Sequence, residues 1–297
     1  MNMKPLRSGA RIALVAPASP FSSDDFHLAC QQLEQKGFKL HPGRHIFQKR
    51  GYLCGTESQR AQDLLEALVD PTVAAVVCVR GGYGSGRLIP WIPFANLPKA
   101  PKPFVGYSDI TFLHQALQSQ GGWVTLHGPN LVDLALQPEG VQQLSETLQG
   151  LNRFEWPVSS QQILRRGHAK GVLRGGNLTC LSHLVGTPHM PDLRNALLFL
   201  EDRGEALYRL DRVMTHLKLS GHLGSVRGLI LGHFQDCGDP FKLWDMMLEH
   251  THEMRIPIFA GMPFGHSWPN DILPLGGVFL MDSGNGIFKA TSRFFEK

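Results

Sequence analysis

The sequence predicts an α/β protein whose first half forms a doubly wound parallel sheet. Short, continuous apolar runs recur along this half, and such runs are typical of strands that are buried on both faces. Segments with helical periodicity separate the runs, which is the order of elements in a doubly wound layer. The chain has 297 residues, and at roughly 100–200 residues per domain this length predicts two domains.

The elements of the first half are expected to alternate between strand and helix. Strands are expected at the continuous apolar runs, which are residues 11–17 (RIALVAP), 38–41, 73–79 (VAAVVCV), 104–107 and 123–126. Helices are expected where apolar residues recur three and four positions apart, at residues 25–36, 58–69, 110–118 and 141–148. The N-terminal domain is therefore expected to span residues 1–150.

A second domain is expected after a break in this pattern. Residues 151–170 (LNRFEWPVSSQQILRRGHAK) are polar and of mixed propensity, which indicates a linker. Beyond it, helices are expected at residues 178–185, 207–219 and 240–250, and strands at residues 196–201, 228–231, 278–281 and 287–290. The C-terminal domain is therefore expected to span residues 171–297.

Composition limits the possible partners and the compartment. The formal charge of +4 comes without a basic cluster, which disfavours nucleic acid and membrane surfaces as partners. The apolar run near the N-terminus is too short for a signal peptide, and no window reaches the roughly 18 apolar residues of a spanning helix. Five scattered cysteines do not suggest a disulfide framework. The cytoplasm is the expected location.

Three loops follow predicted strands, where ligands bind in open α/β sheets. They are the glycine run Arg80–Arg87, the pair Ser108–Asp109 and the pair Glu201–Asp202. The glycine run fails as a dinucleotide fingerprint because Arg87 stands where a third glycine is needed, and it lacks the Lys-Ser/Thr of a Walker loop. Its glycines either permit a tight turn or bring backbone N–H groups close to an anion.

The segment Gly106-Tyr107-Ser108-Asp109 resembles a nucleophile elbow, in which a sharp turn lifts a serine above the sheet. Ile110 replaces the final glycine of that motif, which disfavours an ordinary α/β-hydrolase. The alternative is that Ser108 only caps the following helix, since serine is a favoured N-cap.

A serine nucleophile needs a base, and the base needs an acid that orients it. Among the fourteen histidines, His266 lies in a loop between glycine and serine, where it is freer to face a cleft than a helical histidine. Glu201 ends the apolar strand ALLFL, at the edge of the sheet where a carboxylate is partly desolvated. The alternatives are a structural histidine and a solvated charge at the end of a strand. The histidines do not match a zinc-binding spacing.

Taken together, these segments resemble the LD-carboxypeptidase family, which also contains the microcin C self-immunity peptidases. The matching segments keep the family's order over nearly the whole chain. They are Val15-Ala16-Pro17, Gly55-Thr56-Glu57, Val79–Gly84 with Arg87-Leu88, Gly106–Asp109, His127-Gly128-Pro129, Gly175–Leu178, Leu184–Pro188, Leu200-Glu201-Asp202, Phe264-Gly265-His266 and Leu273–Gly276.

The resemblance implies a Ser-Glu-His triad formed by Ser108, Glu201 and His266. It implies an N-terminal flavodoxin-like or amidotransferase-like domain that carries the serine and a C-terminal swivelling β/α domain that carries the other two residues. It also implies a cytoplasmic homodimer that trims recycled cell-wall peptides, releasing D-alanine from a murein tetrapeptide to leave a tripeptide. No metal or organic cofactor is expected.

Four further site residues complete the expected site. The backbone amides of Asp109 and Gly82 are expected to donate to the oxyanion of the tetrahedral intermediate. Because an exopeptidase must bind a terminal carboxylate, Arg80 is expected to contact the substrate, and Asn177 is expected to line the cleft.

Three other functions remain open. An immunity-type peptidase would cleave a peptide-nucleotide amide, although this compact chain favours the cell-wall substrate. A non-catalytic binding domain would use Ser108 only as a helix cap. A nicotinamide-dependent oxidoreductase is disfavoured by the spacing of the glycines.

Overall fold

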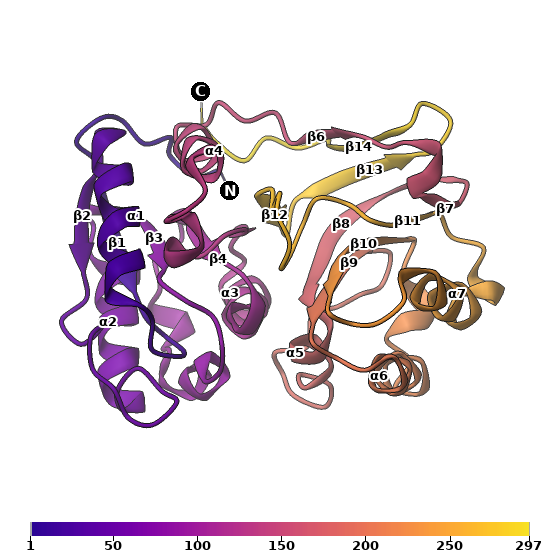
Figure 1. Cartoon of the computed structure of the whole chain (residues 1–297), viewed down its shortest axis with the longest axis horizontal. Helices are drawn as coiled ribbons and strands as arrows, with labels where there is room; N and C mark the ends of the chain where they lie inside the picture. The colour runs from indigo at the N-terminus through magenta and orange to yellow at the C-terminus, as the bar shows by residue number, and fades with distance from the viewer. Residues whose placement is uncertain (1, 297) are drawn as a thin grey trace. The chain divides into compact units, whose positions relative to one another are not determined.

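The computed structural model describes residues 2–296, and these fall into two compact units (Figure 1). Unit 1 contains the described residues up to Asn152, together with Asp271–Pro274 and the residues from Arg293 onward. Unit 2 contains Arg153–Asn270 and Leu275–Ser292. Each unit is built from helices and a β-sheet, which confirms the predicted α/β class.

Unit 1 is built on a six-stranded sheet in the order β12-β5-β4-β3-β1-β2. Its strands are β1 (Arg11–Val15), β2 (Lys39–Pro42), β3 (Val73–Cys78), β4 (Phe104–Gly106), β5 (Thr125–His127) and β12 (Leu273–Leu275). Strands β1 to β5 pair in parallel, and their order is that of a flavodoxin-like sheet. Successive residues of β1, β3, β4 and β5 are almost all buried, so both faces of the sheet are covered, as predicted.

The helices of unit 1 are α1 (Ser23–Gln35), α2 (Glu57–Val69), α3 (Thr111–Gly121) and α4 (Pro138–Leu148). Local sequence signals start several of them. The Ser22 hydroxyl accepts from the amide of Asp25, and Thr56 forms a capping box with Gln59. Short 3-10 helices complete the unit at η1 (Ser85–Trp91), η2 (Phe94–Asn96), η3 (Ser108–Ile110) and η4 (Leu131–Leu134).

Unit 2 is built on an eight-stranded mixed sheet in the order β6-β14-β13-β8-β9-β10-β11-β7. Its strands are β6 (Glu155–Pro157), β7 (Ile163–Arg165), β8 (His168–Asn177), β9 (Leu197–Arg203), β10 (Gly228–Gln235), β11 (Ile258–Phe259), β13 (Val278–Asp282) and β14 (Ile287–Ala290). Strands β8 to β11 are parallel, and the flanking strands are antiparallel. The carboxyl ends of β8 to β11 therefore share one edge.

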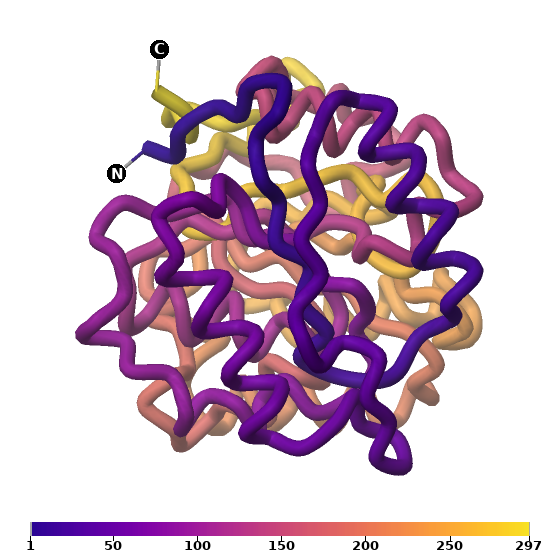
Figure 2. The backbone as a smooth tube through the Cα atoms, turned by 90° about the vertical axis from the view of Figure 1, so that its left-hand side faces the viewer, coloured from indigo at the N-terminus to yellow at the C-terminus, as the bar shows by residue number. Residues whose placement is uncertain are grey.

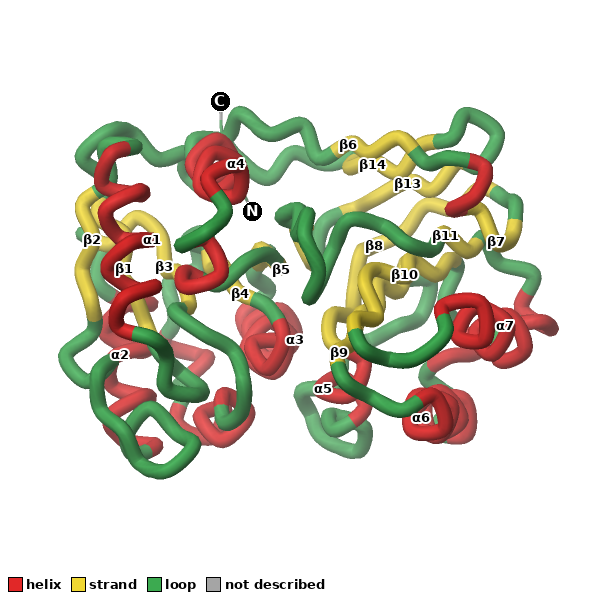
Figure 3. The backbone as a smooth tube through the Cα atoms, viewed as in Figure 1, coloured by secondary structure: helices red, strands yellow, loops and turns green. Residues whose placement is uncertain are grey.

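One face of this sheet is covered by α5 (Leu178–Ser182), α6 (Leu207–Leu219) and α7 (Pro240–His250), which Figure 3 shows in red beside the yellow strands. The helices bury leucine and methionine side chains against β9 and β10. Short 3-10 helices lie at η5 (Ser160–Gln162), η6 (Leu223–Ser225) and η7 (His252–Met254). This apolar layer gives the carboxyl ends of β9 and β10 a rigid base.

Two predicted boundaries are corrected. Residues 151–170 were expected to form a linker, yet they contain β6, β7 and the start of β8, which are strands of the second sheet. Strands β6 and β7 are three residues long and lie at the two margins of the sheet, and β8 combines charged residues with glycines, so none of them has a continuous apolar run. The expected C-terminal domain of residues 171–297 is also interrupted, because Asp271–Pro274 and the residues from Arg293 onward belong to unit 1.

The beginning and the end of the described chain both lie in unit 1. The Met3 amide donates to the Phe294 carbonyl over 2.7 Å, and the indigo and yellow segments run side by side in Figure 1 and again in Figure 2. Among the described residues, no helix has both the length and the apolar character needed to cross a bilayer.

Candidate active site

Ser108 lies in unit 1 at the sharp turn between β4 and the helical segment η3–α3. Tyr107 is still extended, whereas Ser108 has φ +65°, a left-handed conformation that serine rarely adopts. A residue held in such a conformation at a strand-to-helix junction stores strain, and strain of this kind gathers at functional sites. The turn therefore has the backbone geometry expected of a nucleophile elbow.

Gly81 brings the glycine run against this serine. A Cβ atom added to Gly81 would lie 3.0 Å from the Ser108 Cβ and 3.3 Å from its Oγ. A side chain at position 81 would therefore crowd the hydroxyl, and glycine is the residue that leaves this space open. Within this run it is Gly81 that lies against Ser108, whereas the predicted role of the Gly82 amide as an oxyanion donor stays a prediction.

The side chain of Asp109 fixes the glycine run to the elbow. Its Oδ2 accepts from the backbone amide of Ser85 over 2.7 Å, and the Ser85 hydroxyl donates to the Asp109 carbonyl over 2.6 Å. Burial raises the pKa of the Asp109 carboxyl, although these hydrogen bonds counteract the rise. The side chain thus positions the loop, while the predicted donation from the Asp109 amide to an oxyanion stays a prediction.

Gly82 and Arg80 both contact the loop that follows β1. Gly82 has φ +100°, and the Ser19 hydroxyl beside it accepts from the Tyr83 amide over 3.1 Å. The exposed guanidinium of Arg80 donates to the Pro20 carbonyl. These contacts give Arg80 a part in holding the glycine run, and its predicted contact with substrate stays a prediction.

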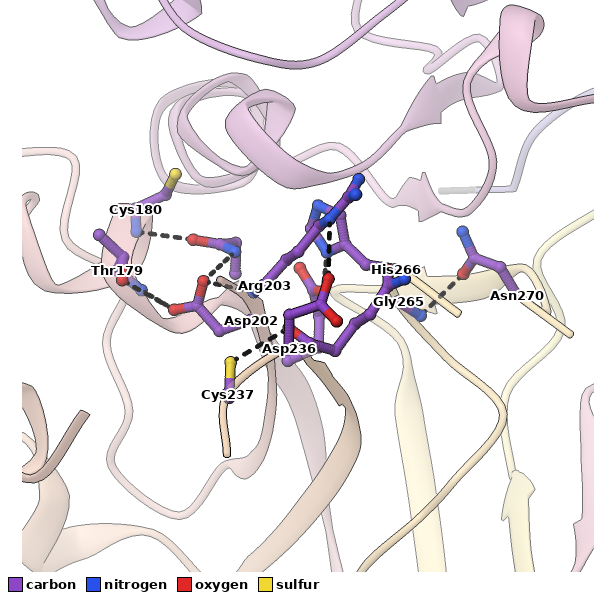
Figure 4. Close-up of polar contacts among 12 residues, drawn as sticks. Thr179, Cys180, Asp202, Arg203, Asp236, Cys237, Gly265, His266 and Asn270 are labelled. Carbon is purple, nitrogen blue, oxygen red and sulfur yellow. Dashed lines mark hydrogen bonds and ion pairs between the residues drawn. The ribbon is translucent and has the colours of Figure 1, made fainter. Parts of the chain in front are cut away.

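Glu201 and His266 meet in unit 2, and Figure 4 shows the surroundings of His266. Glu201 lies near the carboxyl end of β9 and is fully buried, and His266 lies in the loop after β11. His266 Nδ1 donates to Glu201 Oε2 over 2.5 Å. A buried carboxylate that accepts from Nδ1 fixes the orientation and tautomer of an imidazole, which is the role of the acid in a catalytic triad.

The protonation of His266 depends on two opposing effects. Burial disfavours the imidazolium, but the charge of Glu201 and its hydrogen bond favour it more, so the pKa of His266 is raised above its ordinary value. Asp202 adds a smaller effect in the same direction. The imidazole is therefore built to accept a proton and to hold it as a cation.

Gly265 allows His266 to approach the buried carboxylate. Its φ is +108°, and an added Cβ would lie 2.7 Å from Glu201 Oε2. Its amide donates to the Oδ1 atom of Asn270 over 2.8 Å, which anchors the loop (Figure 4). The glycine directly before the histidine is a sequence signal for this constraint, whereas no pattern in the sequence points to Asn270.

Asp202 and Asn177 form a buried network beside the Glu201–His266 pair. Figure 4 shows Asp202 with Thr179 and Cys180. Asp202 accepts from the Asn177 side-chain amide over 2.9 Å, and from both the amide and the hydroxyl of Thr179. Asn177 in turn caps α5 by accepting from the Cys180 amide over 3.0 Å. The sequence offers Asp202 only as one of a pair of charges at the end of a strand, whereas in the structure its carboxylate holds Asn177 and Thr179.

The structure thus brings predicted residues together within each unit. Unit 1 packs the glycine run against Ser108, and unit 2 joins Glu201 to His266. Asn177 lies next to Glu201 in the sheet, as its register partner on β8. Within residues 2–296, the His, Cys, Asp and Glu side chains do not gather in groups of three that would hold a metal ion.

Curated relatives cover nearly the whole chain. The murein tetrapeptide carboxypeptidase of Pseudomonas aeruginosa is 35% identical over 290 residues, which are 92% of this chain and 93% of that protein. A probable murein peptide carboxypeptidase of Bacillus subtilis is 35% identical over 295 residues, covering 95% of this chain and 92% of the relative.

Solved structures share the fold over a similar span. The microcin C7 self-immunity protein MccF, in complex with glutamyl sulfamoyl guanosine, matches with a TM-score of 0.90 and 25% identity over 99% of each chain. The muramoyltetrapeptide carboxypeptidase of Oxalobacter formigenes matches with a TM-score of 0.82 and 30% identity, over 94% of this chain and 97% of that chain.

Domain models of one family match both halves of the chain. The LD-carboxypeptidase N-terminal domain matches residues 12–128, and the LD-carboxypeptidase C-terminal domain matches residues 170–280. The first match includes Ser108, and the second includes Glu201 and His266. These matches confirm the resemblance that the sequence motifs indicated: the chain belongs to the LD-carboxypeptidase family, a family of peptidases.

Proposed function

We propose that this protein is a serine LD-carboxypeptidase that releases the terminal D-alanine from murein tetrapeptides. Its nucleophile would be Ser108, its general base His266, and Glu201 the acid that orients the base. The observation that carries the proposal is the buried Glu201–His266 pair, in a chain of a peptidase family whose serine has left-handed backbone geometry. A buried carboxylate that accepts from Nδ1 leaves Nε2 as the nitrogen that can take a proton from a nucleophile.

The reaction follows from the chemistry of these groups. His266 Nε2 takes the proton of Ser108 as the Oγ attacks the carbonyl of the scissile amide. The resulting imidazolium, stabilised by Glu201, then gives the proton to the leaving amine of D-alanine. Water hydrolyses the acyl-enzyme by the same steps in reverse, with His266 again as the base. The proposal requires the Ser108 hydroxyl and the imidazole to come within hydrogen-bond reach in the active enzyme.

Backbone donors would stabilise the tetrahedral intermediate. We assign this role to the amides of Asp109 and Gly82, since one follows the serine and the other belongs to the run packed against it. Removing one such donor typically costs about 10²–10³ in rate. Arg80 would bind the substrate carboxylate, and Asn177 would line the cleft from the end of β8.

The murein peptide is favoured over a peptide-nucleotide amide by the curated relatives. Relatives named for murein peptides are 35% identical to this chain, whereas the microcin C immunity protein is 25% identical. The immunity-type reaction remains the second candidate, because the TM-score with that protein is 0.90. Peptidoglycan recycling, a cytoplasmic location and a homodimer stay predictions.

The first experiment is mass spectrometry of the purified L-Ala-D-Glu-meso-diaminopimelate-D-Ala tetrapeptide after incubation with the protein. We expect the wild type to release one D-alanine and Ser108→Ala to lose about 10⁶-fold in kcat, the scale seen when a triad nucleophile is removed. Ser119→Ala, an exposed serine on α3, is the matched control and should retain full activity.

The other outcomes separate the alternatives. Equal release by the wild type and Ser108→Ala would show that the serine is only a helix cap and would refute the triad. If the tetrapeptide is not cleaved while an aminoacyl sulfamoyl nucleotide is, the reaction is of the immunity type. In that case the same Ser108→Ala variant decides whether the nucleophile was assigned correctly.

A further inference from the structure

A second candidate site lies in unit 2, at the amino ends of β9 and β10. It is a cavity of about 450 Å³, within the range of roughly 300–1,000 Å³ that small-molecule sites occupy. The residues that line it come from β8, from the turn before β9, from the position before β10 and from β13: Lys170, Gly171, Val172, Arg174, Asp192, Arg194, Asn195, Ala196, Arg227 and Val278. Glu201 lies toward the opposite end of β9.

The charges that line this cavity are unbalanced. Four of its side chains are cationic, and Asp192 is its single carboxylate. Arg194 already pairs with that carboxylate, because its Nη2 and Nε donate to the two oxygens over 2.7 and 2.9 Å. These bonds also lower the pKa of Asp192 to about 2, so it remains ionised. The other three cations therefore outnumber the negative charge available to them.

The excess of positive charge in this cavity is unfavourable at Arg174, because its cationic side chain is partly buried. It stands on β8 opposite Leu198, whose side chain is fully buried, and its own side chain is half-buried. Burial lowers the pKa of Arg174, and the charge of Asp192 counteracts this only in part. A cation drawn out of water in this way is stabilised when a further anion approaches it.

The remaining two cations border the same cavity. Lys170 lies on β8, two residues before Val172, which also lines the cavity, and its side chain is exposed. Arg227 directly precedes β10 and is held in place because its Nε donates to Asn195 Oδ1 over 2.9 Å. The guanidinium of Arg227 still carries two further nitrogens, which suit a tetrahedral oxyanion. Cations on three separate segments thus face one hollow.

We propose that this cavity binds a small molecule through a phosphate or diphosphate group, held by Lys170, Arg174 and Arg227. A phosphate ester offers two charges and three acceptor oxygens, which match several cations better than one carboxylate does. The cavity is larger than a phosphate group, and Val172, Ala196 and Val278 supply apolar lining for the organic part of the molecule.

Isothermal titration calorimetry tests the proposal with three probes: inorganic pyrophosphate, uridine diphosphate and citrate. We expect the wild type to bind both phosphate probes, more weakly at high ionic strength, and to bind citrate less tightly. Lys170→Ala/Arg227→Ala should weaken pyrophosphate binding about 100-fold, at roughly tenfold for each charged contact removed. The matched control Arg166→Ala/Lys218→Ala removes two exposed cations elsewhere in unit 2 and should bind as the wild type does.

Thermal melts of each variant show whether the fold survives. Lys170→Glu reverses the charge of a single exposed side chain. If the double variant unfolds, the proposal is tested by whether Lys170→Glu weakens pyrophosphate binding. The proposal is overturned if the wild type does not bind pyrophosphate saturably, if the two double variants bind it equally, or if citrate binds as tightly as pyrophosphate. None of these outcomes depends on the peptidase activity.

Discussion

The two units hold their candidate catalytic groups by different physical means. In unit 1 the backbone sets the geometry, through the left-handed conformation of Ser108 and the close approach of Gly81. In unit 2 buried charge sets the geometry, through the carboxylate of Glu201 and the network around Asp202. The comparison teaches that both units should be sensitive to atoms added at these close approaches, and that unit 2 should in addition be sensitive to removal of a buried charge.

The largest expected effect after loss of the nucleophile comes from Glu201→Gln. The amide keeps the shape of the side chain but removes the charge that orients and stabilises the imidazolium, so kcat should fall about 10⁴-fold. Steady-state kinetics on the tetrapeptide measures the fall. Glu249→Gln changes an exposed carboxylate on α7 and serves as the control. If both variants were fully active, the charge of Glu201 would not be needed to orient and stabilise the His266 imidazolium.

Two glycine substitutions test the sensitivity to added atoms, one in each unit. Gly81→Ala places a methyl group 3.3 Å from the Ser108 hydroxyl, and Gly265→Ala places one 2.7 Å from Glu201 Oε2. Each should lower kcat about 10²-fold, since displacing a reacting group by an ångström costs about that much.

The stability of the two glycine variants should differ, and this sharpens the comparison. Gly265 has a φ of +108° and Gly81 does not have a left-handed backbone, so alanine is strained at position 265 alone. Chemical denaturation should therefore show a lower free energy of unfolding for Gly265→Ala than for Gly81→Ala. A lower free energy of unfolding for Gly81→Ala than for Gly265→Ala would show that the left-handed backbone at Gly265 does not make alanine unfavourable there.

The pH dependence of kcat/KM reports on the base. His266 acts when neutral, and Glu201 raises its pKa, so the acidic limb of the profile should lie above the ordinary histidine value of about 6.5. The residual activity of Glu201→Gln should show this limb at lower pH. If the acidic limb of the kcat/KM profile lay at the same pH in Glu201→Gln as in the wild type, a group other than His266 would be responsible for it.

The same pair contributes to stability with a definite sign. Because the folded pKa of His266 is raised, its contribution is fully present below the unfolded value of about 6.5 and is lost as pH rises through the folded pKa. Melting curves of the wild type and Glu201→Gln should therefore differ in their pH dependence across this range.

The smallest expected effect concerns the loop contact of unit 1. Asp109→Ala removes the carboxylate that accepts from the Ser85 amide and leaves that buried donor unsatisfied, at a cost of about 1–3 kcal/mol. Urea denaturation measures the loss. Asp133→Ala, which removes a carboxylate bonded to the Asn130 amide in the same unit, is a useful comparison. An unchanged stability for Asp109→Ala would mean that Asp109 does not hold the glycine run.

Much of the fold was predictable because its local signals agree with its packing. The helices at residues 207–219 and 240–250 begin and end where their apolar periodicity does. Strand β8 escaped prediction because its sequence, HAKGVLRGGN, combines charges with glycines. One of them, Gly175, lies where an added Cβ would be 1.9 Å from the Phe199 carbonyl oxygen, so close backbone packing takes the place of an apolar side chain.

The candidate site was predictable in residue type and less so in geometry. The resemblance singled out Ser108, Glu201 and His266, and the structure joins the last two directly. Sequence alone did not separate the roles of Gly81 and Gly82, because both lie in one run and only the folded loop shows which contacts the serine. Asn270 was equally hidden, since an asparagine in a loop has many ordinary uses.

The return of the chain to unit 1 has a consequence for biosynthesis. Strand β12, at residues 273–275, pairs with β5, so the first sheet is completed by residues made long after its other five strands. A nascent chain that ends at Asn152 therefore exposes the unpaired edge of β5, and such an edge can pair with other chains. Translation of more than a hundred further residues must precede its closure.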